Sequence, residues 1–533
     1  MAVPGDRSCR PVMPCGAGTW GDIPIDASTI HVDGSYAGGG SDGSIDKPWT
    51  TISDAVAAAP SGGLVAVAAG SYAESVTLTK TIQLWGVCPE RVELAGTASG
   101  FGALFFRSGS SGSEVRGVAV TGDAGAGIVI SGAENILLEQ VWVHDALGRG
   151  VNIEDTLGAT SATLRTVLIE GSHALGVLVG GASATLVNVV VRDTLPRASD
   201  QDFGRGIEIL DASPGPVTIT GSVVERNHDA GIAIAGSQAT VEGVVVRDTL
   251  PNASNERAGI GIGIKSSAET RAPSFALVRS SLLDHNHEAG AYLIESQGTF
   301  EGVVVRRTQP RASDQQYGWG MGIQGDPAAG APATALVRSS LVEDCHDVGL
   351  LVAASDATLE GLVVRRTLPQ ASDAFFGWGV LIQVEPSGSA PAKAIVRGSF
   401  VDQSVETGLG VMGADATVDA TIVRATATRA ADGAFGDGVT VTSVGFGDVV
   451  VPASATLTHM LVEQHARAGI SNFGASVSLG ASDSVCNTIH LNGEIFLTPY
   501  TFQNLGGNRC GCPEAILDAC AVQTSGLVPP DPP

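Results

Sequence analysis

The chain has 533 residues, of which 44% are hydrophobic but only 5% aromatic, so any large core must be built from aliphatic side chains. A formal net charge of −25 and a sequence pI near 4.6 argue against nucleic acids and anionic membranes as partners. No apolar run approaches the roughly 18 residues that a transmembrane helix needs.

The first segments are predicted to form a leader and a cap. Residues 1–30 are a Cys/Pro/Gly-rich leader without periodicity, and residues 31–62 contain a short helix over 52–59 with Ser53 or Asp54 as its N-cap. Such a helix can plug the open end of a core. No signal peptide precedes Cys9, so we expect Met1 to begin a mature form whose leader is missing.

Two interleaved motifs repeat within residues 63–484. One is Gly361-Leu-Val-Val-Arg-Arg-Thr-Leu-Pro-Gln-Ala-Ser-Asp373, and the other is Ser340-Leu-Val-Glu-Asp-Cys-His-Asp-Val-Gly349. Their aligned acids and arginines are Glu170, Arg192, Glu225, Arg247, Asp284, Arg306, Glu343, Arg365, Asp402, Arg424 and Glu463. The spacing alternates between 22 residues and 33 to 39 residues, so one step is fixed and the other carries an insertion.

A step of 22 residues with short β-branched runs fits one coil of a parallel β-helix. We therefore predict an all-β, single-stranded, right-handed parallel β-helix in which the longer step adds a loop at one fixed corner. Because neighbouring strands lie about 4.8 Å apart, equivalent residues stand in columns. The aligned residues should form a structural ladder in which each arginine meets an acid above and below.

The start of the coils resembles a known family. The order D-G-S, P-W-T-T-I-S-D-A-V (48–56) and V-A-V-A-A-G-S-Y-A-E-S-V-T-L-T-K (65–80) is similar to the opening of secreted bacterial envelope proteins of the pectin-lyase-like superfamily. The resemblance covers residues 31–95 by motif, and it implies a right-handed parallel β-helix. It implies little about activity, because lyases, hydrolases, esterases, phage spikes and non-catalytic surface proteins share this fold.

Seven of the eight cysteines lie toward the ends of the chain, where open coils need fastening. They are Cys9, Cys15, Cys88, Cys486, Cys510, Cys512 and Cys520. Their pattern predicts disulfides in an oxidising compartment, with Cys9 bonded to Cys15 or Cys88 and the last four bonded among themselves. Residues 485–533 are thus a disulfide-bearing C-terminal cap with a Pro-rich tail, and Cys345 is a free thiol.

The insertion loops carry most of the outward-pointing chemistry. Their aromatic residues are candidates for stacking on an extended glycan: Phe203, Tyr317, Trp319, Phe375, Phe376 and Trp378. At least Trp319 and Trp378 should be partly exposed along one edge. The alternative is that Ser-Asp caps a short turn whose aromatic residue packs on the coil.

Metal and catalytic sites have weaker support. The histidine column His173, His228, His287 and His346 is too widely spaced for one zinc ion, so no metal site and no cofactor is predicted. Calcium could use Asp200, Asp314, Asp373 and Asp432, although no dense run of aspartates exists. Lys265 departs from the repeat and is the one weak catalytic candidate.

These observations favour an exported, non-catalytic protein of the cell surface or periplasm that binds polysaccharide or serves as a rigid spacer. The alternative is a polysaccharide lyase or glycoside hydrolase acting on an extended, acidic glycan. None of the familiar enzyme motifs of the fold is intact. An enzyme should show a groove whose residues depart from the repeat, and a spacer should not.

Overall fold

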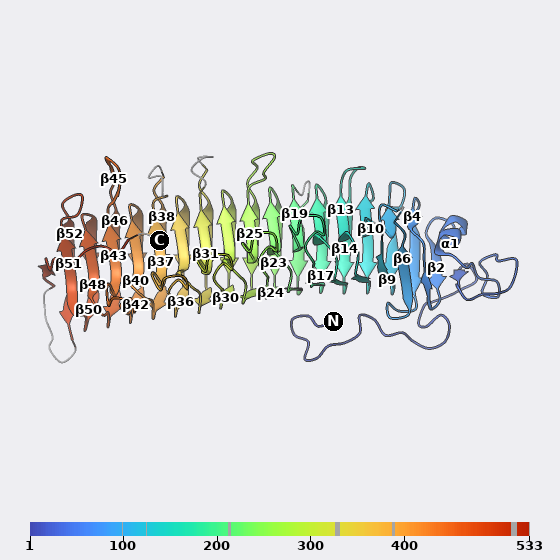
Figure 1. The fold of residues 1–533 in the computed structure, drawn as a ribbon, viewed down its shortest axis with the longest axis horizontal. Coiled ribbons are helices and arrows are strands. Elements are labelled where there is room, and N and C mark those ends of the chain that lie inside the picture. The colour runs from blue at the N-terminus through green and yellow to red at the C-terminus, as the bar shows by residue number, and fades with distance from the viewer. Residues whose placement is uncertain are drawn as a thin grey trace. The chain divides into compact units, whose positions relative to one another are not determined.

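The computed structural model describes residues 1–98, 100–123, 125–211, 215–325, 331–385, 390–512 and 520–531. The chain divides into two compact units, unit 1 of Met1–Asn255 and Ser267–Ala272, and unit 2 of Glu256–Ser266 and Pro273–Pro533. In each unit the chain winds through coils, and a complete coil contributes one strand to each of three sheets, which we call A, B and C (Figure 1).

In unit 1 the neighbouring strands of all three sheets pair in parallel. Sheet A contains β1 (Ile30–Val32), β2 (Gly63–Val67), β5 (Ile82–Gly86), β8 (Glu114–Arg116), β11 (Ile136–Glu139), β14 (Ser161–Arg165), β17 (Ser183–Val187), β20 (Val217–Thr220) and β23 (Gln238–Glu242). Sheet B contains β3 (Gly70–Tyr72), β6 (Val92–Gly96), β9 (Ala119–Gly122), β12 (Trp142–His144), β15 (Leu168–Glu170), β18 (Val190–Arg192), β21 (Val223–Glu225) and β24 (Val245–Arg247). Sheet C contains β4 (Val76–Leu78), β7 (Leu104–Phe106), β10 (Ala126–Ser131), β13 (Arg149–Glu154), β16 (Leu175–Gly180), β19 (Arg205–Leu210) and β22 (Ala230–Ala235).

Unit 2 repeats this arrangement. Sheet A contains β26 (Phe275–Arg279), β29 (Gln297–Glu301), β32 (Thr334–Arg338), β35 (Asp356–Glu360), β38 (Lys393–Arg397), β41 (Asp415–Asp419), β46 (Ser454–Thr458), β49 (Ser476–Gly480) and β52 (Thr501–Gly506). Sheet B contains β27 (Leu282–Asp284), β30 (Val304–Arg306), β33 (Leu341–Glu343), β36 (Val363–Arg365), β39 (Phe400–Asp402), β42 (Ile422–Arg424), β47 (Leu461–Glu463), β50 (Asp483–Val485) and β53 (Arg509–Gly511). Sheet C contains β25 (Ile260–Lys265), β28 (Ala289–Ile294), β31 (Trp319–Gln324), β34 (Val348–Ala353), β37 (Trp378–Gln383), β40 (Thr407–Met412), β43 (Asp437–Thr442), β48 (Ala468–Phe473), β51 (Ile489–Glu494) and β54 (Val522–Gln523). An antiparallel hairpin, β44 (Val444–Phe446) with β45 (Val449–Val451), projects between two coils.

Both units are parallel β-helices, as the repeat and the family resemblance predicted. Alternation along each strand builds the core: on β35, Ala357 and Leu359 are buried, whereas Asp356 points to solvent. Glycine recurs at the start of sheet C strands because the coil is tight there. A Cβ atom at Gly320 would overlap Cγ1 of Val342 and the carbonyl oxygen of Gly349.

One helix, α1 (Ile52–Ala58), forms where the sequence predicted it, and it buries Ile52, Ala55 and Val56. Its N-cap is Thr51 rather than Ser53 or Asp54, because the Thr51 hydroxyl accepts a hydrogen bond from the backbone N–H of Asp54. Within the described ranges, no helix is both long and apolar enough to cross a bilayer.

The insertions lie at two corners, so the prediction of one fixed corner was wrong. One set joins sheet B to sheet C, at residues 193–204 in unit 1 and at 307–318, 366–377 and 425–436 in unit 2. The other set joins sheet C to sheet A, for example between Gln324 and Thr334. Both corners border sheet C, so insertions stand at both ends of its strands.

The aligned arginines and acids form a column on sheet B in each unit. In unit 1, Arg192 contacts Glu170 and Arg247 contacts Glu225, each at 2.5 Å. In unit 2, Arg306, Arg365 and Arg424 contact Asp284, Glu343 and Asp402 at 2.9, 2.6 and 2.9 Å. For the described residues, each of these close contacts reaches the acid of the preceding coil and not, as predicted, the acids on both sides.

The described residues form three disulfides, Cys15–Cys88, Cys486–Cys512 and Cys510–Cys520. The predicted bond of Cys9 was wrong, because Cys15 pairs with Cys88 and leaves Cys9 as an exposed free thiol. Cys345 is a free thiol as predicted, and it is buried beside the hydroxyl of Thr308.

The ladder predicts that losing an arginine costs less stability when its acid has a second arginine partner. Asp284 is bound by both Arg306 and Arg307, so Arg306→Ala should cost about 1 kcal/mol or less. The carboxylate of Asp402 is only 9% exposed and has Arg424 as its close partner, which also lies 4.7 Å from the Phe400 ring. Removing Arg424 leaves a buried acceptor, so Arg424→Ala should cost about 1 to 3 kcal/mol. Thermal unfolding of both variants measures the difference, and equal losses would contradict this account.

The cysteine assignment predicts two thiol classes. Cys9 is exposed, so a thiol reagent should modify it in the native protein. Cys345 is buried, and its burial raises the pKa of the thiol to about 11, so it should react only in denaturant. Counting modified thiols by mass under both conditions tests this. A Cys9→Ser variant should show no rapid class, and a third reactive thiol in denaturant would contradict the disulfide assignment.

Candidate functional site: a cleft on sheet C of unit 2

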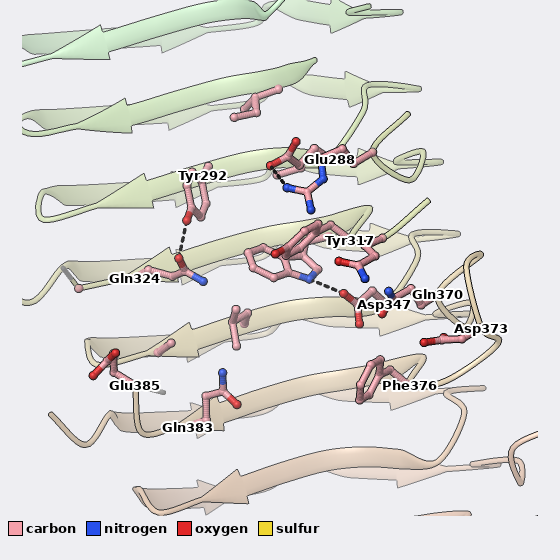
Figure 2. Close-up of a pocket in the computed structure, with 18 residues that line it drawn as sticks. Glu288, Tyr292, Tyr317, Gln324, Asp347, Gln370, Asp373, Phe376, Gln383 and Glu385 are labelled. Atoms are coloured by element: carbon pink, nitrogen blue, oxygen red, sulfur yellow. Dashed lines mark hydrogen bonds and ion pairs between the residues drawn. The ribbon is translucent and has the colours of Figure 1, made fainter. Parts of the chain in front are cut away.

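A cleft of about 550 Å³ lies on the outer face of sheet C in unit 2, over strands β28, β31, β34 and β37. Figure 2 shows Gln370 and Asp373, from the insertions after sheet B, at one end of these strands, and Gln383 and Glu385 at the other. The two sets of insertions therefore form its opposite walls. This volume is in the range of ordinary ligand sites.

The floor of the cleft is aromatic. The ring of Tyr292 on β28 lies over Gly322 of the neighbouring strand β31. A Cβ atom at Gly322 would come within 2.7 Å of this ring, so glycine leaves room for it. The ring centroid of Trp319 is 6.2 Å from that of Tyr292 and 4.9 Å from that of Tyr317. The guanidinium of Arg311 packs 4.2 Å from the Tyr317 centroid. Three rings from two coils thus form one partly exposed surface.

Acidic residues directly precede the sheet C strands of every second coil in this part of the chain. Glu288 lies 3.7 Å from Arg311, and the fully buried Glu406 accepts a 2.6 Å hydrogen bond from Arg429. Asp229 has the equivalent position in unit 1, where its partners include Arg205 and Asn252. In these coils the acid is compensated by a basic or amide side chain, which is what burial of a carboxylate requires.

Asp347 is the exception in this column. The loop position of Arg311 and Arg429 is occupied by Gln370, whose amide donates to the hydroxyl of Ser372 and not to Asp347. Asp347 is 3% exposed; its Oδ2 accepts a 2.9 Å hydrogen bond from the Trp319 indole, but its Oδ1 has no hydrogen-bond partner within the described parts of the chain. Burial raises the pKa of Asp347 to about 6, the Trp319 hydrogen bond lowers it, and nearby Asp373 and Glu406 raise it further.

Amide groups add hydrogen-bonding capacity near the second wall. The hydroxyl of Tyr292 is bonded to the side-chain oxygen of Gln324, and the largely buried Gln383 lies further along the same wall (Figure 2). Glu385 follows Gln383 and places another carboxylate at the cleft. The arrangement offers aromatic faces, hydrogen-bonding amides and carboxylates within one concave surface.

Three of the six predicted aromatic candidates, Tyr317, Trp319 and Phe376, line the cleft. Trp378 does not, and its predicted exposure was wrong: it is 0% exposed because its ring packs against Leu381 and Met412 and covers Gly410. Phe375 packs 4.0 Å from the guanidinium of Arg429 instead.

The remaining candidates lie elsewhere. Phe203 belongs to unit 1, where its ring packs against the guanidinium groups of Arg197 and Arg205. Lys265 is exposed at the end of β25, and the structure does not place it among the residues that line the cleft. Sequence reasoning missed Tyr292, Glu288 and Asp347 as site residues. The available signal was Gln370, where the repeat has arginine on both sides.

Most of the candidate metal ligands already have hydrogen-bond or ion-pair partners within the protein. Three of the histidines bond backbone carbonyls: His173 that of Pro196, His228 that of Thr194 and His346 that of Pro369. Asp200, Asp314 and Asp432 pair with an arginine of the same loop, and Asp373 accepts from the backbone of Phe375. Across the described ranges, no cluster of three or more histidine, cysteine, aspartate or glutamate side chains is arranged to hold a metal ion.

Residues 36–271 match a family model described as a protein of unknown function, DUF1565. No curated protein matches the sequence. The similar solved structures include the following three. The periplasmic alginate epimerase AlgG has 10% identity and a TM-score of 0.41, over 72% of this chain and 78% of that one. Pectate lyase Pel9A has 16% identity and a TM-score of 0.35, over 58% and 79%. The catalytic unit of a GH87 α-1,3-glucanase from Streptomyces thermodiastaticus strain HF3-3 has 17% identity and a TM-score of 0.36, over 92% and 70%.

The unpaired carboxyl of Asp347 leads to a pH-dependent stability prediction. The pKa of Asp347 in the folded protein is about 6, above the ordinary value of 3.8. At a pH between these two values, the carboxyl is protonated in the folded state and ionised in the unfolded chain. The stability from this proton is present at low pH and is lost as pH rises through about 6. The asparagine of Asp347→Asn cannot ionise. The free energy of unfolding of this variant relative to the parent should therefore be about 2 kcal/mol higher at about pH 7.5 than at about pH 4.

Unfolding midpoints of the two proteins at both pH values measure this gain. Asp415→Asn is the matched control, because Asp415 is an exposed carboxylate on β41. A stability difference between Asp347→Asn and the parent that does not change with pH would show that folding does not raise the pKa of Asp347.

Proposed function

We propose that the protein is an exported β-helix that binds a segment of an extended glycan in the cleft on sheet C of unit 2. The observation that carries this proposal is the composition of the cleft, in which the rings of Tyr292, Tyr317 and Trp319 lie beside amide and carboxylate side chains. Sugar rings present apolar faces that stack on aromatic rings, and their hydroxyl groups bond to amides and carboxylates.

The geometry of the coils supports an extended ligand. The residues that line the cleft come from several coils, and strands of neighbouring coils lie about 4.8 Å apart, so a ligand of more than one sugar ring can lie across them. Three disulfides support export to an oxidising compartment, at the cell surface or in the periplasm. Rigid coils on both sides would hold the two walls of the cleft apart before a ligand arrives.

Hydrolysis of the bound glycan is a second candidate function, and Asp347 favours it. A buried carboxyl with a raised pKa can donate a proton to a leaving group, and it departs from the repeat as an active site should. Lyase chemistry has less support, because neutralising a uronate carboxylate requires a free cation. Arg311, the arginine that lines the cleft, is already paired with Glu288 and Asp314.

The proposal predicts that glycan binding depends on the ring of Tyr317 and not on the ring of Phe203, its equivalent in unit 1. Tyr317→Ala should weaken binding of the best ligand from a glycan array by about three- to tenfold, the contribution of one aromatic stacking contact. Phe203→Ala is the matched control, because Phe203 has the same loop position in unit 1, and it should bind as the parent does. Equal binding by all three proteins would contradict a role for the cleft.

The same glycan separates binding from hydrolysis. Release of new reducing ends by the parent without unsaturated uronate products, and its loss in Asp347→Asn with binding retained, would identify the protein as a hydrolase. Binding without release would identify a non-catalytic glycan-binding protein.

A further inference from the structure

The cleft has an excess of negative charge. Four carboxylic acids line it, Glu288, Asp347, Asp373 and Glu385, and the lining contains one cationic side chain, Arg311. That arginine is shared between Glu288 at 3.7 Å and Asp314 at 2.5 Å. A ligand that brings further negative charge would add to this excess of acidic groups, which disfavours uronic-acid glycans.

The position of the missing positive charge is defined by the repeat. Two coils away on either side, Arg311 and Arg429 approach the acids Glu288 and Glu406 from the same loop position. At the equivalent place midway between them, Gln370 carries no charge and Oδ1 of Asp347 has no partner in the described structure. Asp347 lines the cleft, so a cationic group of a ligand can take this place.

The aromatic floor favours the same chemistry. An ammonium group over the face of a tyrosine or tryptophan ring is attracted by the ring quadrupole. Arg311 already packs in this way on Tyr317, and Trp319 holds Asp347 through its indole N–H, so an aromatic ring and the unpaired carboxyl adjoin (Figure 2). An amino group attached to a sugar ring could contact both while the ring itself stacks.

We propose that the cleft selects glycans carrying free amino groups, and that one ammonium group of the ligand occupies the place that an arginine takes two coils away on either side, next to Oδ1 of Asp347. This inference rests on the proposed function, since it names the class of glycan that the same cleft binds. The amino group supplies the charge that the coil lacks, and the aromatic floor supplies the stacking surface.

The test compares four probes on the intact protein by calorimetry, at about pH 6 and physiological ionic strength, where surface charges are screened over about 8 Å. The probes are a glucosamine hexamer, its fully N-acetylated counterpart, an oligogalacturonate and tetralysine. The glucosamine hexamer should bind at least about tenfold more tightly than the acetylated one, the size of one charge-assisted hydrogen bond. The oligogalacturonate and tetralysine should bind more weakly than both.

A variant distinguishes the effect of the charge at Asp347 on ligand binding from the effect of the protein's negative net charge. Gln370→Arg introduces the residue that the same loop position has two coils away on either side, so it should raise the unfolding temperature and reduce binding of the glucosamine hexamer by about tenfold, while binding of the acetylated hexamer changes little. Asp415→Asn changes the net charge by the same amount on another sheet of unit 2 and should leave all affinities unchanged.

Each other outcome overturns a defined statement. Equal affinity for the two hexamers, tighter binding of oligogalacturonate or tetralysine, or an unaffected Gln370→Arg variant would overturn the selection of amino sugars and leave glycan binding in place. Failure of every saccharide, both in calorimetry and on the glycan array, would overturn the proposed function itself.

Discussion

Backbone pairing between successive coils is the constraint on which the rest of each unit depends. Because parallel strands pair in register, every side chain lies next to its equivalents in the neighbouring coils, as the pairing of Glu343 with Arg365 illustrates. A residue type that recurs at one position of the repeat must therefore pack well against copies of itself or against its neighbours in the adjacent coils. Aliphatic residues meet this condition inside the coils. Charged residues meet it only when their signs alternate, and sheet B shows this alternation.

The same constraint makes a departure from the repeat informative. A buried carboxylate without a partner is destabilising, and the coils around Asp347 avoid this cost with Arg311 and Arg429. At Asp347 the arginine is missing although the acid remains and its burial is nearly complete. Uncompensated polar groups of this kind accumulate at functional sites, where a ligand or a reaction uses them.

The cleft itself results from local additions to a regular stack. A bare coil of this fold presents sheet C as an open face, but the insertions before and after β31 and β37 raise walls at both ends of these strands. Gln370 and Asp373 stand on one wall, while Gln383 and Glu385 stand on the other. The stack gives rigidity and spacing, and the insertions give the surface its chemistry.

The sequence alone determined the β-helix, the column of alternating charge and most of the disulfide positions. These follow from the periodicity of the repeat and from the composition of the chain, which can both be read directly from the sequence. It also identified Tyr317, Trp319 and Phe376 as candidates, since loop aromatics are visible in the text of the repeat. The tertiary structure decided the rest. The burial of Trp378 against Met412 and the exposure of Trp319 could not be told apart, because the two residues have the same repeat position and differ only in the side chains of adjacent coils. The second insertion corner, the meeting of both walls over one sheet and the isolation of Oδ1 of Asp347 depend on contacts between residues far apart in the chain, and no local pattern records such contacts.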